Sequence, residues 1–148
     1  MDKKLFHNLI DVLDKTIKAY TQLKVLFEEK RDLLKSANPD DLGITDNKIM
    51  SLNNQIKQLN KSRTELALKI CGEDVNMSGF VEIAEIKAPE FVEPLNERKV
   101  KICKLVPELT LLNNQNVELL KHGIIMTNKM LETVIDAFAP QGCNYNGA

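Results

Sequence analysis

Apolar residues recur every seven positions over the first and last thirds of the chain, and this repeat restricts the fold to long, packed helices. A stripe that alternates by three and four residues keeps one face of a slightly supercoiled helix buried. In the first third the repeat runs through Phe6, Leu13, Tyr20, Phe27 and Leu34. In the last third it runs through Leu95, Ile102, Leu109, Asn116, Gly123, Met130 and Ala137. A second series, stepping by seven from Arg98, runs through Leu105, Leu112, Leu119, Met126 and Thr133.

The composition favours one helical domain over residues 1–148. Hydrophobic residues make up 43% of the 148 residues and aromatic residues only 5%, with no Trp, which suits helical layers built from Leu, Ile and Val. The formal net charge is −1, from 20 basic and 21 acidic residues. Nucleic-acid binding usually needs a basic face or stripe, so we expect no nucleic-acid partner.

The first two helices are expected to form an antiparallel hairpin. The first helix is predicted over about 3–37 and is followed by a stop at 38–43, where Pro39 and Gly43 favour a turn. The second is predicted from about Thr45, which with Asp46 is a candidate cap, to Cys71. Its apolar stripe is interrupted by Arg63, which we place at the edge of the seam, paired with a carboxylate. A ligand-recognising arginine is the alternative.

The rest of the chain predicts a short element and a third long helix. Residues 73–88 are expected to form a short helix, capped by Ser78, or an ordered linker. The last helix is predicted from about Glu90 to Phe138, with Pro107 kinking or splitting it. The tail, about 140–148, is expected to be flexible. The fold class is therefore all-α, an elongated, coiled-coil-like antiparallel bundle of three long helices with a short helix or linker before the last.

Motifs for catalysis, metal binding and membrane insertion are not found in the sequence. There is no Gly-rich phosphate loop, zinc-protease or serine-hydrolase motif, and no His lies at ligand spacing from other ligand residues, so we expect no catalytic residue, cofactor or metal. Cys71, Cys103 and Cys143 are widely spaced and are expected to be reduced thiols. The first residues lack the apolar run of a signal peptide, and no run is long enough to span a membrane, so we expect a cytoplasmic protein.

One stretch and the tail resemble a known family. Residues 112–120 read Leu-Asn-Asn-Gln-Asn-Val-Glu-Leu-Leu, and a short tail follows with Tyr145-Asn146-Gly147. This arrangement resembles the FlgN-type flagellar export chaperones, whose last long helix carries Leu-Asn-x-x-Asn-x-x-Leu-Leu before a tail with a Tyr. Tyr20 in the first helix and Arg63-x-x-Leu66 in the second are compatible with that family.

The resemblance implies a cytoplasmic chaperone of the flagellar type III secretion system. Such a protein binds the C-terminal helical segments of the hook–filament junction proteins FlgK and FlgL. It prevents their premature assembly and aids their delivery to the export gate and the ATPase complex. Carried over by position, Asn113 and Asn116 match the family's Asn pair, and Tyr145 matches the tail Tyr implicated in client binding and gate docking.

A groove on the last helix is the expected client site. Apolar residues beside or behind the seam exceed what one stripe needs, and an amphipathic client helix would fit such a groove. Together with the Asn pair and Tyr145, the predicted partner-binding residues are Leu119, Leu120, Ile124, Ile125, Leu131, Val134 and Ile135. Packing of this surface against the first helix or against a second subunit in a homodimer is the alternative.

Two further interpretations stay open at this stage. Asn116 is interpreted first as a seam residue that fixes helix register, and second as a direct client contact. For the whole protein, the alternative to a chaperone is an oligomeric coiled-coil scaffold or adaptor. A helical-bundle enzyme or metal protein would need a His or carboxylate cluster that the sequence lacks.

Overall fold

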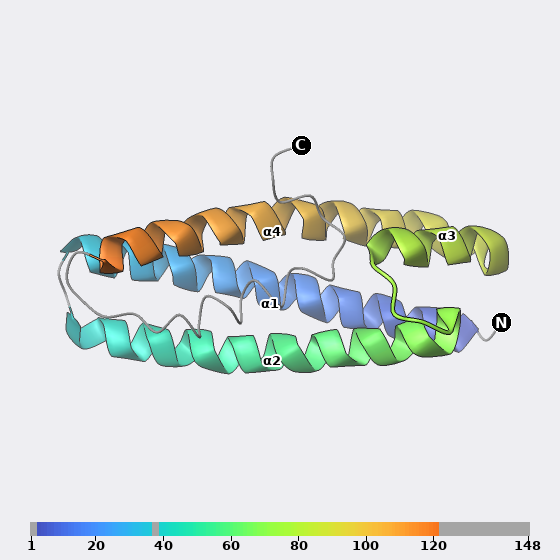
Figure 1. Ribbon diagram of the computed structural model, residues 1–148, viewed down its shortest axis with the longest axis horizontal. Coiled ribbons are helices and arrows are strands. Elements are labelled where there is room, and N and C mark those ends of the chain that lie inside the picture. Colours follow the sequence, from blue (N-terminus) through green and yellow to red (C-terminus); the bar gives the residue numbers. More distant parts are fainter. Residues whose placement is uncertain (1–2, 37–38, 122–148) are drawn as a thin grey trace.

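The computed structural model of the protein describes residues 3–36 and 39–121, and every secondary-structure element in these ranges is helical (Figure 1). The elements, in chain order, are α1 (Lys3–Ser36), α2 (Pro39–Cys71), α3 (Met77–Lys87), the 3-10 helix η1 (Pro89–Phe91) and α4 (Val92–Leu120). The all-α class and the short helix before the last long one are thereby confirmed.

Helix α1 lies between α2 and α4 and packs against both (Figure 1). Helices α1 and α2 are antiparallel, as the hairpin prediction requires, while α4 returns in the same direction as α1. Ion pairs show the parallel alignment, since Asp14 of α1 pairs with Arg98 and, further along, Lys24 pairs with Glu108. The short α3 packs on the beginning of α4 and brings the chain back beside α1.

A single apolar core runs along the three helices. It is built from the stripe on α1 that the seven-residue repeat predicts, and the apolar members of the first α4 series join it as far as Leu109. Burial of a large apolar side chain contributes about 1.5–3 kcal/mol, so this stripe is the main source of bundle stability. The side chains of α1 in this core are Phe6, Leu9, Leu13, Ala19, Tyr20, Leu23 and Phe27, each 0 or 1% exposed.

The second apolar series predicted on α4 is only partly buried. Leu105 and Leu119 of that series are half-buried, whereas Val106, Asn113 and Leu120, one position further along, are buried. The seam therefore follows the steps 102, 106, 109, 113, 116 and 120, and Leu112 of the second series is buried beside it. The repeat alone did not decide between these two neighbouring stripes, because both alternate by three and four. Only one of the two stripes contains Asn113.

Helix α2 begins six residues earlier than the sequence predicts. It starts at Pro39, so Pro39–Gly43, expected as a turn, forms its first turns and Thr45 lies buried within it. Proline is well tolerated in the first turn of a helix, where its missing N–H would have no partner anyway. The negative charges of Asp40 and Asp41 in this first turn interact favourably with the positive end of the helix dipole.

The connection between α2 and α3 is closed by a glycine and an asparagine. Gly72 adopts φ +79°, a left-handed conformation that favours Gly, and its N–H donates to the Leu68 carbonyl at 3.0 Å. The Asn76 side chain then caps α3 by accepting from the Gly79 N–H at 3.0 Å. The short helix is thus confirmed, but its cap is Asn76 and the prediction of Ser78 was wrong by two positions.

Alanine substitutions at Gly79, near the start of α3, and at Gly43, near the start of α2, form a matched test of these two helix starts. A Cβ added at Gly79 would lie 2.6 Å from the Val75 Cβ, whereas one at Gly43 would meet nothing within 4 Å. We expect Gly79→Ala to lower the free energy of unfolding by about 1–3 kcal/mol, through overpacking. Gly43→Ala should raise it by about 0.5–1 kcal/mol, because Gly43 is helical and open. Urea unfolding followed by circular dichroism measures both; a loss of stability in Gly43→Ala would contradict a helix there.

Pro107 does not split the last helix. Helix α4 continues through it as one element from Val92 to Leu120. The Pro107 ring faces solvent, and beside it the Thr110 hydroxyl donates to the Val106 carbonyl at 2.9 Å. The predicted extension of this helix to Phe138, and the flexible tail, lie outside the described residues.

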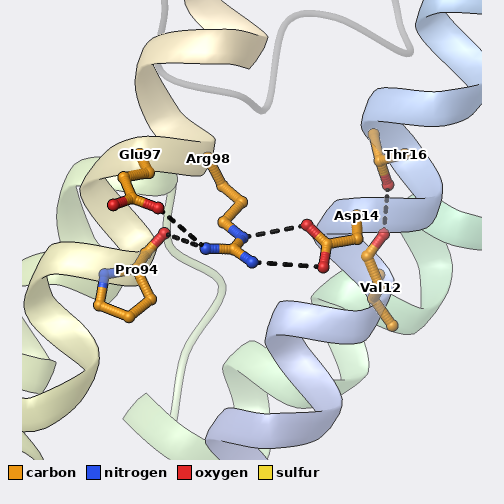
Figure 2. A network of polar contacts seen from close by, with 6 residues as sticks. All are labelled: Val12, Asp14, Thr16, Pro94, Glu97 and Arg98. Carbon is orange, nitrogen blue, oxygen red and sulfur yellow. Dashed lines mark hydrogen bonds and ion pairs between the residues drawn. The ribbon is translucent and has the colours of Figure 1, made fainter.

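Arg98 and its polar partners form a cluster that connects the first halves of α1 and α4. Figure 2 shows Arg98 donating from Nε and Nη2 to the two carboxylate oxygens of Asp14, at 3.0 and 3.4 Å. Its Nη1 donates to the Pro94 carbonyl at 3.2 Å and to Glu97 at 3.4 Å. Two parallel bonds to one carboxylate restrict geometry more than a single ion pair does, so the cluster helps to fix the alignment of the two helices.

Arg63 is not at the edge of the seam. It is 2% exposed and ranks among the largest fully buried side chains. Its Nη1 donates to the Val75 carbonyl at 3.2 Å and lies 3.8 Å from an Asp74 carboxylate oxygen. Burial lowers the pKa of the guanidinium from its ordinary value, while the negative charge of Asp74 opposes that shift. The predicted carboxylate partner is thus present, but the predicted location at the edge of the seam was wrong.

Candidate functional site

The asparagine stretch lies on the last turns of α4 and faces α1. Asn113 and Asn116 are 2% and 1% exposed. The Asn116 amide donates from Nδ2 to the Phe27 carbonyl of α1 at 3.0 Å. This bond joins two helices that run in parallel, the setting in which a buried Asn restricts register. The predicted seam position of Asn116 is confirmed.

Both buried amides keep one polar atom without a protein partner. Asn113 Nδ2 and Asn116 Oδ1 are buried and accept or donate no hydrogen bond within the described part of the chain. A buried polar group without a partner costs about 1–3 kcal/mol. The α1/α4 seam is therefore less stable here than an apolar seam would be.

A shallow cleft of about 490 Å³ lies beside these amides at the α1/α4 boundary. Among the described lining residues, the half-buried Leu119 provides the apolar part and Glu118 a carboxylate. Leu120, by contrast, is 4% exposed and turns away from solvent. The remaining lining residues are Arg31, Lys35, Asn114 and Gln115.

Ion pairs join α1 to its neighbours on both sides. Lys24 and Glu108 approach to 2.7 Å, and the hydrogen bond from the Lys24 ammonium to Glu108 holds the pKa of Lys24 above its ordinary value. On the α2 side, the ammonium of Lys30, whose side chain is 3% exposed, lies 2.7 Å from an Asp46 carboxylate oxygen. A buried ammonium that loses its carboxylate partner is costly, so alignments of α1 and α2 that separate Lys30 from Asp46 are disfavoured.

Only part of the predicted partner-binding set can be placed. Asn113, Asn116, Leu119 and Leu120 come together on the last turns of α4, but only Leu119 lines a cleft. The others, Ile124, Ile125, Leu131, Val134, Ile135 and Tyr145, lie outside the described residues. Sequence reasoning missed the basic side of this cleft, formed by Arg31 and Lys35, whose spacing of four residues on one helix face was the available signal.

The described residues form no metal site and no membrane-spanning helix. Within residues 3–36 and 39–121, no group of three or more His, Cys, Asp or Glu side chains could hold a metal ion. Cys71 and Cys103 are free and half-buried, and burial raises the pKa of the Cys71 thiol. Of the helices that the structure describes, none is long and apolar enough to cross a membrane.

The comparison with family models decides the class of protein. The FlgN family, described as FlgN protein, matches residues 1–148, the whole sequence. The chain belongs to the FlgN family. It is therefore a flagellar export chaperone in general terms, as the resemblance of residues 112–120 implied. Comparisons with curated proteins and with solved structures give no match.

Family membership places the asparagine stretch in context. In this FlgN chain the stretch is part of the α1/α4 seam, and its two Asn side chains are covered by α1. The surface available next to it is the cleft with Leu119, Arg31 and Lys35. A client helix could contact that cleft without moving α4, whereas contact with Asn113 or Asn116 would require the seam to open.

Proposed function

We propose that this FlgN-family protein binds the C-terminal helical segments of the hook–filament junction proteins FlgK and FlgL in the cytoplasm. It keeps them from assembling prematurely and aids their delivery to the export gate and its ATPase complex. It acts by binding and carries out no catalysis. The observation that carries the proposal is the family match over residues 1–148, together with the Leu-Asn-x-x-Asn-x-x-Leu-Leu stretch at the end of α4.

The physical basis of the proposal is shielding of an amphipathic helix. Subunits that form a filament must keep their assembling segments apart until export, and an apolar groove between helices covers such a segment. The end of α4 offers a half-buried Leu119 beside the basic side chains of Arg31 and Lys35. An amphipathic client helix with carboxylates beside its apolar face would satisfy both features.

Calorimetric titration of the full chain tests the proposal directly. The ligands are C-terminal peptides of FlgK and FlgL from the same genome, with a flagellin C-terminal peptide as the control. Saturable binding of the junction peptides, with none of flagellin, is the expected result. Absence of binding to all three would remove the assigned clients. A stable oligomer that sediments identically with and without the peptides would favour the coiled-coil scaffold instead.

Tyr145→Ala is expected to weaken client binding or export without changing the fold. Tyr145 matches the family's tail Tyr and follows α4 in the sequence, outside the described residues. We expect about a tenfold loss of affinity for the FlgK peptide, the loss that about 1.4 kcal/mol of binding free energy produces. Circular dichroism checks the fold, and Asn144→Ala is the control at the adjacent position. Unchanged affinity together with unchanged motility would contradict this role of Tyr145.

A further inference from the structure

The α1/α2 pair carries a second groove, separate from the cleft beside the asparagine stretch. Two neighbouring clefts, of about 440 and 560 Å³, lie between α1 and α2, and Lys48 lines both of them. Together they extend from Gln22 to Ser36 on α1 and from Asp41 to Gln55 on α2. At 1.5 Å per residue each side is roughly 20 Å long, which is the length of about four helical turns. The two helices lie side by side over this length (Figure 1).

This α1/α2 groove is on another side of α1 than the cleft with Arg31 and Lys35. Leu33 lines the α1/α2 groove and Arg31 lines the α1/α4 cleft, and residues two apart in a helix point in different directions. The two surfaces could therefore be occupied at the same time. A ligand of the α1/α2 groove would leave the asparagine stretch untouched.

Apolar side chains of both helices contribute to the lining of the α1/α2 groove. Val25 is 51% exposed and Ile44 is 57% exposed, and both line it. Leu26 and Leu33 are half-buried between them, and Leu52 lies beneath. Exposed apolar side chains gathered along one groove mark an interaction surface more strongly than single exposed residues do.

The charges around the α1/α2 groove are mostly negative. Glu29, Asp32 and Asp41 line the end near the α1–α2 connection, and among the described lining residues Lys48 is the one cation. Arg31 offsets part of this charge from outside, since its Nε lies 3.7 Å from an Asp32 oxygen. Three carboxylates against Lys48 and Arg31 leave this described part of the lining with a net negative charge, so a ligand with positive charges beside an apolar stripe is complementary to it.

We propose that the α1/α2 groove is a docking site for a cationic amphipathic helix of a partner protein. The partner helix places apolar side chains at spacings of three and four on Val25, Ile44 and Leu33, and its Lys or Arg side chains lie toward Glu29, Asp32 and Asp41. This inference goes beyond the proposed function, because it concerns a second surface and does not depend on FlgK or FlgL binding.

The probe for this site is a synthetic peptide of about four helical turns. It has Leu at spacings of three and four and Lys on both sides of the Leu stripe, and a fluorescent label at one end. Binding to the full chain is measured by anisotropy at low and at physiological salt, with a Glu-flanked version of the same peptide as the control. We expect saturable binding of the Lys peptide that weakens as salt rises, and at least tenfold weaker binding of the Glu peptide.

Three matched pairs of variants locate the binding. Glu29→Lys with Asp32→Lys should weaken it at least tenfold, whereas Glu82→Lys with Glu85→Lys, an exposed pair with the same spacing on α3, should leave it unchanged. Ile44→Ser should weaken it and Met50→Ser, equally exposed at 55% on α2, should not. Lys48→Glu should tighten it several-fold, and Lys57→Glu, exposed on the same helix, should not.

The results separate this proposal from its competitors. Equal effects of groove and control variants, or equal binding of the two peptides, would overturn it. It would also be overturned if the chain sediments as a dimer that Ile44→Ser dissociates, since a second copy would then cover the α1/α2 groove. FlgK peptide titrations on Ile44→Ser and Lys48→Glu keep the two proposals apart, because these two residues do not line the cleft with Arg31 and the variants should leave client affinity unchanged whether or not the clients are correctly assigned.

Discussion

Arg63→Ala is expected to lower the free energy of unfolding of this FlgN-family protein by about 3 kcal/mol. The substitution empties the space of a side chain that is 2% exposed. It also leaves the Val75 carbonyl without the donor that now lies 3.2 Å away. Because this bond joins α2 to the segment before α3, the loss should loosen residues 72–76 as well as the core. Urea unfolding measures the stability, and amide hydrogen exchange measures the loosening.

Two further variants show which property of Arg63 stabilises the bundle. Arg63→Met keeps most of the volume and removes both the charge and the donor, so we expect a loss of only about 1 kcal/mol. A buried charge is costly to desolvate, and the lowered pKa of Arg63 is the sign of that cost. Arg98→Ala is the control for a less buried arginine, with a side chain 23% exposed, and should cost about 1 kcal/mol or less. If Arg63→Ala cost no more than Arg98→Ala, the buried role of Arg63 would be wrong.

The long helices were predictable because their apolar period is strong, whereas their ends depend on single residues. The stripe through Phe6, Leu13 and Tyr20 has one interpretation, and the structure buries all three. At Pro39 two outcomes were open, since a proline stops a preceding helix and also starts a new one, and the second holds. The same ambiguity applies to Asn76 and Ser78, which are both good caps two positions apart.

The candidate site was less predictable, because burial of a polar side chain is a tertiary property. The period placed Arg63 in an apolar slot, but only the packing of the segment before α3 explains how a guanidinium is accommodated there. Asn113 belongs to neither of the two predicted seven-residue series. It is nevertheless buried, because the face of α4 that packs in the seam includes position 113. The α1/α2 groove was not predicted either, because it is formed by the edges of two helices, and which edges meet depends on how the hairpin packs.

Replacing Asn113 and Asn116 together by Leu is expected to raise the free energy of unfolding by about 2–4 kcal/mol. Each amide keeps one buried atom without a partner, Nδ2 in Asn113 and Oδ1 in Asn116, and each such atom costs about 1–3 kcal/mol. The bond from Asn116 to the Phe27 carbonyl, at 3.0 Å, is lost in the variant and offsets part of the gain. Leu has as many side-chain heavy atoms as Asn, but its two methyl groups are bulkier than the amide oxygen and nitrogen, so some repacking against α1 is included in this range. Asn114→Leu, an exposed neighbour, is the control and should change stability by no more than about 0.5 kcal/mol.

A gain in stability would mean that the polar groups in the seam have a role other than stabilising it. Two further measurements on the same double variant decide which role that is. If the amides fix the register of the parallel α1 and α4, the Leu variant should adopt more than one register and give more than one amide resonance for each seam residue, because an all-apolar seam no longer restricts pairing. If instead they contact the client when the seam opens, the variant should remain one species and bind the FlgK peptide at least fivefold more weakly. A client-contact role also requires that opening α4 be easy, and the two unsatisfied amides lower the free energy needed for it. A double variant that is less stable than the wild type would contradict both roles, since the amides would then stabilise the closed seam.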